Sequence, residues 1–267
     1  MIKQIKKVGV IGAGTMGAGI AGQVANAGTE VWLLDLPSDG ENVNSLSAKG
    51  LERLKDPDMP GLMSVEAEKL IRLGNTRDDF HQLEDCDWVA EAVVERLDIK
   101  QALYHQLNDV CKDTTIITSN TSTIPISLLT KGMPKKFCER FAITHFFNPV
   151  RFMRLLELVR GEFTREDVIN TLDMFSETML GKGVVPCSDT PGFLANRVGV
   201  FAIQCALYKA FKYKLSPTEA DAFFGRPLGL PKTGVFGLYD LIGIDLMADV
   251  VKSLVSILPE NDAFHKY

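Results

Sequence analysis

A glycine-rich turn near the start of the chain constrains its fold more than any other feature. An apolar strand runs directly into Gly12, Gly14 and Gly17, which are spaced as Gly-x-Gly-x-x-Gly. In a dinucleotide-binding unit the first glycine permits a tight turn, the second lets the backbone approach a pyrophosphate, and the third lets the next helix pack closely. An alanine-rich helical stretch at 18–27 and a second apolar strand at 31–34 follow in the required order. The pattern therefore predicts a nucleotide-binding unit rather than a glycine-rich turn of an unrelated α/β domain.

The residue that ends the second strand indicates which dinucleotide binds. Asp35 lies 18 residues after Gly17, where a carboxylate accepts hydrogen bonds from the hydroxyls of the adenosine ribose. A carboxylate at this point repels a 2′-phosphate, and a site for NADP usually adds a nearby arginine. No basic residue follows Asp35 until Lys49. We therefore expect NAD as the cofactor.

The order of apolar and helical patterns predicts two domains. From residue 1 to about 189, short apolar runs alternate with helical patterns, which is typical of a parallel sheet covered by helices on both faces. Further strands are expected at 88–93, 114–118, 141–147, 154–159 and 184–185, and further helices at 41–55, 65–73, 96–112 and 164–181. After Asp189 only helical patterns follow, at 193–212, 217–224 and 239–258.

The predicted fold class is therefore α/β. We expect a Rossmann-like doubly wound sheet over residues 1–189, which binds NAD, followed by a smaller all-α domain over 190–267 for substrate binding or dimerisation. The helical part ends without a capping pattern, so we expect it to be incomplete. A core of that size is marginal alone and should pack on the first domain or on another subunit.

Composition limits the partners and the compartment. A net charge of −5 argues against broad binding to nucleic acid or to an anionic membrane, but does not exclude a local basic pocket. The five cysteines are scattered and form no C-x-x-C pair, which argues against a disulfide framework and against a zinc site. The basic N-terminus precedes a glycine-rich strand–turn–helix pattern rather than a signal peptide, and no apolar run is long enough to span a bilayer. We expect a cytoplasmic protein without a metal site.

A lone histidine, His145, lies near the end of the strand expected at 141–147. Ligands of Rossmann sheets bind at the carboxyl ends of the strands, and histidine suits a general base near neutral pH. A histidine among aromatic residues is nevertheless more often structural. Glu157 favours the catalytic interpretation, because a carboxylate in an apolar strand needs a partner and His145 lies across the Asn148–Pro149 turn. Such a carboxylate fixes the imidazole tautomer and stabilises the imidazolium.

A second polar feature is the turn Ser119–Thr123, which directly follows a predicted strand. At the carboxyl edge of the sheet its hydroxyl and amide groups would bond the nicotinamide or a substrate oxygen. The alternative is that they cap the helix expected before Leu128. The sequence leaves both interpretations open.

At this point the chain resembles the L-3-hydroxyacyl-CoA dehydrogenases of fatty-acid β-oxidation over nearly its whole length. The resemblance rests on five motifs in the same order, which are Gly12–Ala21, Glu91–Glu95, Ser119–Ser122, His145–Val150 and Asp189–Arg197. It implies oxidation of a 3-hydroxyacyl-CoA to the 3-ketoacyl-CoA. In that reaction the 3-hydroxyl proton passes to a base of the protein and the C3 hydride passes to NAD.

The resemblance also implies a role for individual residues. His145 is the catalytic base, Glu157 orients it, and Ser122 and Asn196 hydrogen-bond the reacting substrate oxygen. The predicted cofactor-binding residues, from the turn motif and the resemblance together, are Gly12, Gly14, Thr15, Met16, Gly17, Asp35, Ala92, Glu95, Lys100, Asn120, Ser122 and Asn148. For Glu95 and Lys100 the alternative is a solvated helix start. For Asn196 it is an amide that ties the corner between the domains.

Basic residues and one late segment bear on the contacts of coenzyme A and on the partner chains. The candidates for its phosphates are Lys49, Arg53 and Lys55, which an exposed charged helix face explains equally well. The segment 225–234 is similar to the dehydrogenase portion of large multifunctional β-oxidation proteins, which also carry an enoyl-CoA hydratase region. We therefore expect an acyl-CoA substrate, and either a homodimer or a larger chain that contains this portion.

Two other functions stay open. The first is a related dehydrogenase of a free hydroxy acid or sugar acid that shares the histidine and glutamate. The second is a non-catalytic NAD-binding protein that kept the fold.

Overall fold

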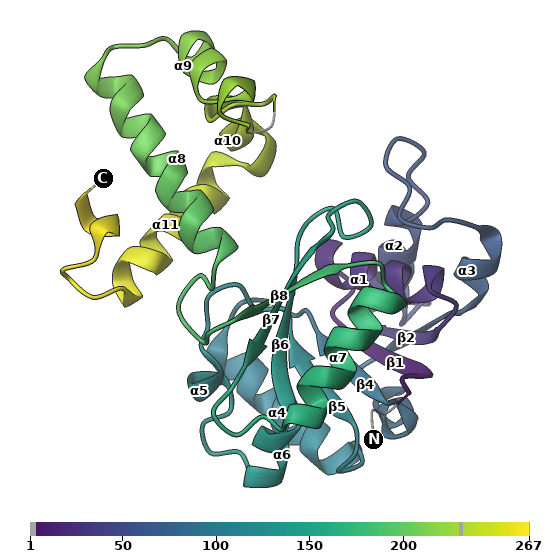
Figure 1. The fold of residues 1–267 in the computed structure, drawn as a ribbon. Helices are drawn as coiled ribbons and strands as arrows, with labels where there is room; N and C mark the ends of the chain where they lie inside the picture. The colour runs from purple at the N-terminus through teal and green to yellow at the C-terminus, as the bar shows by residue number, and fades with distance from the viewer. Residues whose placement is uncertain (1–3, 230–231, 267) are drawn as a thin grey trace. The chain divides into compact units, whose positions relative to one another are not determined.

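The first strand, β1 (Lys7–Ile11), lies inside an eight-stranded sheet of order β3-β2-β1-β4-β5-β6-β7-β8 (Figure 1). The other strands are β2 (Glu30–Asp35), β3 (Ile71–Asn75), β4 (Trp88–Glu91), β5 (Ile116–Ser119), β6 (Phe141–Phe146), β7 (Leu155–Arg160) and β8 (Gly183–Cys187). All neighbouring pairs are parallel except β6 and β7, which are antiparallel. The computed structural model describes residues 4–229 and 232–266.

The order of the strands creates a switch point beside β1. The chain first adds β2 and β3 on one side of β1 and then places β4 on its other side. In open α/β sheets, ligands bind where the strand order reverses in this way, outside the carboxyl ends of the strands. The glycine-rich turn follows β1 at this point.

Helices cover both faces of the sheet, so its central strands are buried along their whole length. Every residue of β4, β5 and β6 is buried, as expected for strands that bury both faces. The helices of this part are α1 (Thr15–Asn26), α2 (Ser45–Arg53), α3 (Val65–Lys69), α4 (Leu97–Val110), α5 (Ile126–Leu129), α6 (Lys135–Glu139) and α7 (Glu166–Thr178), with a short 3₁₀ helix at Phe80–Asp85. Trp88, from β4, packs edge-on against Phe175 of α7 within the main core. On the other face Tyr104 of α4 packs against Phe141 of β6.

The chain divides into two compact units, Met1–Asp189 and Thr190–Tyr267. The described elements of the second unit are helical, namely α8 (Ala195–Lys212), α9 (Pro217–Phe223), α10 (Phe236–Ile242), α11 (Ile244–Ile257) and 3₁₀ helices at Arg226–Leu228 and Ala263–Lys266. A small core of Val200, Met247, Leu254, Leu258 and Phe264 holds this unit together. The predicted α/β class with a helical second domain is confirmed. Leu230 and Pro231, part of the segment 225–234 considered above, lie outside the described residues.

Several predicted boundaries were wrong. The helix expected at 65–73 ends at Lys69, and Ile71–Asn75 instead forms β3, which pairs with β2 from Val31↔Ile71 to Asp35↔Asn75. The helix expected at 239–258 is two helices, because Gly243 adopts a φ of 100° between α10 and α11. The helix expected at 41–55 begins only at Ser45, and α5 and α6 were not predicted. Helices of four and five residues are too short to show a helical period.

Across the residues that the structure describes, no helix combines the length and apolar character that a membrane span requires.

Candidate active site

The three glycines of the turn after β1 meet different constraints. A Cβ on Gly12 would lie 2.5 Å from the carbonyl oxygen of Ala92, and the residue has a φ of 96°. A Cβ on Gly17 would lie 1.7 Å from the carbonyl oxygen of Gly12. Gly14 has a φ of −64°, and a Cβ there would meet no protein atom within 4 Å. The protein itself therefore requires glycine at 12 and 17, whereas at Gly14 the open space in front of the backbone fits a pyrophosphate.

The exposed Thr15 and the half-buried Met16 follow Gly14 in the first turn of α1. The amide groups of this turn and the positive end of the α1 dipole favour an anion at this position. At the carboxyl end of β2, Asp35 accepts a hydrogen bond from the Ala13 N–H at 2.6 Å and one from Leu36 N–H at 2.7 Å. This places the Asp35 carboxylate beside the glycine-rich turn, as its predicted ribose contact requires.

The basic residues predicted to meet the phosphates of coenzyme A have different surroundings. Arg53 donates to the carbonyl oxygen of Ala13 at 2.8 Å, so its guanidinium supports the glycine-rich turn. Lys55 pairs with Glu52 at 3.0 Å and Glu68 at 2.7 Å. Lys49 is exposed on α2. Arg53 and Lys55 thus have structural partners within the first unit, and a contact with coenzyme A stays a prediction for all three.

A buried carboxylate joins the carboxyl ends of β4 and β5 to α4. Glu91 is fully buried and accepts hydrogen bonds from Lys100 Nζ at 2.6 Å, from Tyr104 OH at 2.6 Å and from Ser119 Oγ at 2.7 Å. It also accepts one from the Val93 N–H at 2.8 Å. Burial beside this carboxylate raises the pKa of the Tyr104 hydroxyl well above its usual value. We did not predict a site role for Glu91. The sequence feature that could have indicated this role is an acidic residue at the end of an apolar strand.

The surroundings of Lys100 contradict the alternative of a solvated helix start. Its side chain is 1% exposed, and Nζ pairs with Glu95 Oε2 at 3.2 Å as well as with Glu91. Glu95 is 40% exposed, so its carboxylate lies between the buried network and the solvent. Ala92 begins the loop between β4 and α4 that carries Glu95. The predicted cofactor contacts Ala92, Glu95 and Lys100 therefore belong to one connected structure at the carboxyl edge of the sheet.

The polar turn after β5 is held by Glu95 and does not cap a helix. Glu95 Oε1 accepts hydrogen bonds from Thr121 Oγ1, from Thr123 Oγ1 and from the Ser122 N–H. The residue at the N-cap of α5 is Pro125, and the side chain that accepts from the first N–H of this helix, that of Ile126, is Asp189 at 3.0 Å. The alternative that the turn caps the helix before Leu128 was therefore wrong for this helix.

Asn120 links that turn to the strand that carries the histidine. Its Oδ1 accepts a hydrogen bond from the Phe146 N–H at 2.9 Å, while its own N–H donates to the carbonyl oxygen of Glu91 at 2.8 Å. The half-buried Ser122 and the exposed Asn148 lie on the loops that follow β5 and β6. Because β5 and β6 are parallel neighbours, both loops start at the same edge of the sheet.

His145 and Glu157 face each other across the antiparallel pair β6 and β7. His145 Nδ1 lies 2.6 Å from Glu157 Oε2, and the two side chains are 8% and 0% exposed. Cys187 Sγ, from β8, lies 3.7 Å from the other carboxylate oxygen of Glu157. Nδ1 is thus the ring nitrogen that the Glu157 carboxylate engages. The predicted contact of these two side chains is thus present.

Asn196 belongs to the second unit, in the first turn of α8. Its neighbour Arg197 pairs with Asp262, which ties the start of α8 to the end of that unit. The role of Asn196 toward the substrate stays a prediction.

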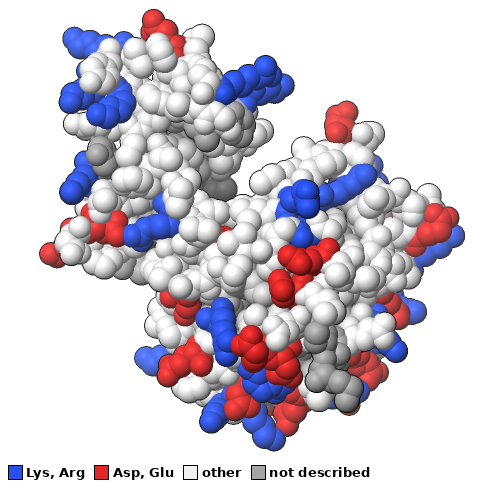
Figure 2. Space-filling model, viewed as in Figure 1, with Lys and Arg blue, Asp and Glu red and all other residues white. Residues whose placement is uncertain are grey.

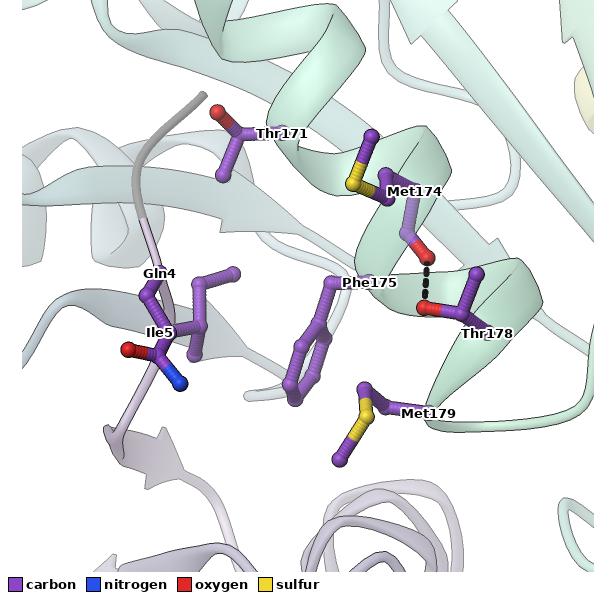
Figure 3. Close-up of a pocket in the computed structure, with 7 residues that line it drawn as sticks. All are labelled: Gln4, Ile5, Thr171, Met174, Phe175, Thr178 and Met179. Atoms are coloured by element: carbon purple, nitrogen blue, oxygen red, sulfur yellow. Dashed lines mark hydrogen bonds between the residues drawn. The ribbon is translucent and has the colours of Figure 1, made fainter. Parts of the chain in front are cut away.

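An open surface pocket of about 340 Å³ lies away from this site (Figure 3). Figure 3 shows Phe175 and the two methionines of the α7 region facing Ile5, which precedes β1 and so lies at the amino edge of the sheet. Its lining contains no titratable side chain. The pocket therefore offers no group for proton transfer, whereas the carboxyl edge has several.

The distribution of surface charge and the search for metal-binding groups identify no further site residues among the described residues. Figure 2 shows acidic and basic side chains intermingled on the visible face of the first unit. Within residues 4–229 and 232–266, no group of three or more His, Cys, Asp or Glu side chains is placed to hold a metal ion.

Comparisons with known proteins give a consistent result for both units. The family model for the 3-hydroxyacyl-CoA dehydrogenase NAD binding domain matches residues 7–190, and that for the 3-hydroxyacyl-CoA dehydrogenase C-terminal domain matches 192–266. The chain is 42% identical, over 98% of its length and 76% of the relative, to the "Probable 3-hydroxyacyl-CoA dehydrogenase" of Deinococcus radiodurans.

Other matches include longer proteins and a solved structure. The chain is 42% identical over its whole length to the "Putative fatty acid oxidation complex trifunctional enzyme" of Rickettsia prowazekii, and spans 37% of that protein. Its structure matches that of (S)-3-hydroxybutyryl-CoA dehydrogenase from Ralstonia eutropha with a TM-score of 0.80 and 32% identity. That match covers 95% of this chain and 88% of the other.

Proposed function

Because the chain belongs to the 3-hydroxyacyl-CoA dehydrogenase family, we propose that it oxidises (3S)-3-hydroxyacyl-CoA to 3-ketoacyl-CoA with His145 as general base. The observation that carries this proposal is the buried pair of His145 and Glu157, 2.6 Å apart at the carboxyl edge of the sheet. A histidine held by a carboxylate at this edge can take a proton from a hydroxyl beside a bound dinucleotide.

The residues at the carboxyl ends of β1, β2 and β4 fit NAD. The open space at Gly14 and the N-terminus of α1 suit the pyrophosphate, and Asp35 suits the adenosine ribose. When bound, NAD⁺ supplies the acceptor for the hydride that leaves C3 of the substrate. Glu95, Lys100, Asn120, Ser122 and Asn148 lie on the loops and helix that continue this edge and are proposed to hold the rest of the cofactor.

His145 Nε2 takes the proton of the 3-hydroxyl, and the imidazole becomes an imidazolium. Glu157 is a positioning residue, because its carboxylate keeps the proton on Nδ1 and stabilises that cation. Ser122 and Asn196 are proposed to hydrogen-bond the substrate oxygen as it becomes a ketone. Such bonds accelerate the reaction only to the extent that they strengthen in the transition state. The reverse reduction uses the same imidazolium as its acid and is therefore favoured at lower pH.

The trifunctional relatives support a further proposal about context. The same two-domain unit would work either as a homodimer or as one portion of a longer chain for fatty-acid oxidation. The chemistry assigned to His145 and Glu157 is the same in both cases.

The test of this function is NADH formation, followed at 340 nm, with (3S)-3-hydroxybutyryl-CoA and with the matching free acid. The wild type should oxidise the thioester, and His145→Gln should reduce kcat by about a hundredfold or more, the usual contribution of a general base. The matched control is His105→Gln, which makes the same chemical change at an exposed position of α4. Equal turnover of the free acid would favour the hydroxy-acid alternative. NADH binding without turnover of either compound would favour a non-catalytic protein.

A further inference from the structure

A buried lysine just before β8 has no part in the proposed proton transfer. Lys182 is 4% exposed, and its ammonium donates to the carbonyl oxygen of Val150 and, at 2.9 Å, to that of Met153. Nζ also lies 5.9 Å from the centre of the Phe146 ring. Within the part of the chain that the structure describes, this ammonium pairs with no carboxylate.

Keeping this charge buried is costly. Burial lowers the pKa of Lys182 from 10.5 to about 8, because the cation has lost most of its water. Two carbonyl oxygens and an aromatic face offset only part of that loss. The contact between the start of β8 and Arg154 does not need the lysine, since the Gly183 N–H already donates to the carbonyl oxygen of Arg154 at 2.7 Å.

Both carbonyl oxygens belong to the loop at 147–154, which joins β6 to β7. The loop leaves β6 two residues after His145 and carries Asn148, one of the predicted cofactor contacts. The loop packs closely on α1: Val150 lies so near Gly19 that a Cβ added to this glycine would lie 2.8 Å from the Val150 side chain. From α1, Gln23 Nε2 donates to the carbonyl oxygen of Leu180 at 2.7 Å. Lys182 is therefore placed where this loop, α1 and the segment before β8 meet.

We propose that Lys182 is a positioning residue whose ammonium holds the 147–154 loop against α1 and so keeps Asn148 in place for cofactor binding. The inference rests on the proposed function, in which Asn148 contacts NAD. The pair of His145 and Glu157 does not depend on this lysine, since the ladder from Ala142↔Arg160 to Phe146↔Leu156 fixes it. Loss of Lys182 should therefore weaken cofactor binding more than it slows the chemical step.

The first experiment compares the full chain with Lys182→Met, which keeps the length of the side chain and removes its donors. The control is Lys136→Met, at an exposed lysine that pairs with Asp113 on the surface. We expect the Kd for NADH, measured by its fluorescence, and the KM for NAD⁺ to rise about tenfold in Lys182→Met. The kcat should fall less than about threefold, and Lys136→Met should change neither constant. A folded Lys182→Met with unchanged Kd and KM would overturn the proposal, as would a fall in kcat alone.

A second measurement uses only the wild type and does not depend on the folding of a variant. Between pH 7 and 9.5 the Kd for NADH should rise about fivefold as the ammonium loses its proton and its hydrogen bonds lose their charge. The loop also carries Arg151, which bonds the carbonyl oxygens of Pro60 and Leu62, and the exposed Arg154, and both arginines stay charged in this range. Gln23 of α1, which bonds the carbonyl oxygen of Leu180 two residues before Lys182, and Phe146 of β6, whose ring faces Nζ, are both neutral. A Kd that does not change with pH would overturn the proposal.

The two experiments separate the inference from the proposed function. If NADH binding depends on pH in the wild type and weakens in Lys182→Met as expected, but the wild type oxidises no 3-hydroxyacyl-CoA, the function is refuted and the positioning role is supported. A wild type that turns over the thioester with NADH constants indifferent to Lys182 would do the opposite.

Discussion

Replacing Glu91 by Gln tests whether the buried network at the carboxyl edge stabilises the first unit. The carboxylate of Glu91 is fully buried and accepts hydrogen bonds from four donors, of which Lys100 Nζ is charged. The amide of glutamine is neutral and presents a donor where the carboxylate presents an acceptor. Lys100, at 1% exposure, would then keep only the pair with Glu95 at 3.2 Å.

The size of the effect follows from these contacts. Removing one partner of a buried ion pair costs about 3–5 kcal/mol, because the other charge stays buried without its counter-ion. Glu95 compensates in part, so we expect Glu91→Gln to lower the free energy of unfolding by about 3 kcal/mol. Adding Lys100→Met should recover part of this loss, because no unpaired charge then remains.

Urea denaturation followed by tryptophan fluorescence measures this loss of stability in the first structural unit, Met1–Asp189. The chain has two tryptophans, Trp32 in β2 and Trp88 in β4, so the signal reports on the sheet. The control is Asp113→Asn, which removes an exposed ion pair with Lys136 and should leave the midpoint unchanged. A loss below about 1 kcal/mol in Glu91→Gln, or a double variant less stable than the single one, would refute the reasoning.

Three further predictions follow from single positions. Gly14→Ala should keep the midpoint of thermal unfolding, because the added Cβ meets no protein atom. The variant should nevertheless bind NADH at least about tenfold more weakly, because the Cβ would occupy the space proposed for the pyrophosphate. Equal affinity in a fluorescence titration would refute that proposed contact. The pKa of Lys182 is lowered in the folded protein, so the unfolded chain binds more protons than the folded chain between pH 8 and 10.5. As pH rises through this window, the stability of the wild type relative to Lys182→Met should therefore increase by up to about 3 kcal/mol. Urea denaturation at both ends of the window checks the sign. Burial raises the pKa of Cys86 to about 12 and that of Cys111 to about 11, so a thiol reagent at pH 8 should modify the half-buried Cys138, Cys187 and Cys205 before these two. Rapid labelling of Cys86 in a peptide map would contradict this.

The sequence was informative where local spacing decides the structure. The Gly-x-Gly-x-x-Gly turn, the strand before it and Asp35 lie within one short segment, and their spacing was enough to predict the unit. The strand β3 was missed because Ile71 and Leu73 fit the end of a helix as well as a strand, and only pairing with β2 decides between them. The break at Gly243 was missed because the apolar period continues across it from α10 to α11.

The site was predictable to the same extent. His145 and Glu157 are separated by one turn of an antiparallel pair, so an apolar strand with one acidic residue was enough to suggest their contact. The buried network around Lys100 was not predictable, because Glu91 lies on another element and a lysine at a helix start is usually solvated. Lys182 has its acceptors 29 and 32 residues earlier in the chain, a distance over which no sequence pattern indicates contact.

The central claim, that Glu157 acts on the reaction only through His145, is tested most directly by a double-mutant cycle in kcat for NADH formation. The cycle compares wild type, Glu157→Gln, His145→Gln and the double variant with (3S)-3-hydroxybutyryl-CoA under saturating NAD⁺. Since residues that act as one unit are not additive, the double variant should be no slower than His145→Gln alone. If the two losses multiply in the double variant, Glu157 acts on the reaction independently of His145 and the account is wrong.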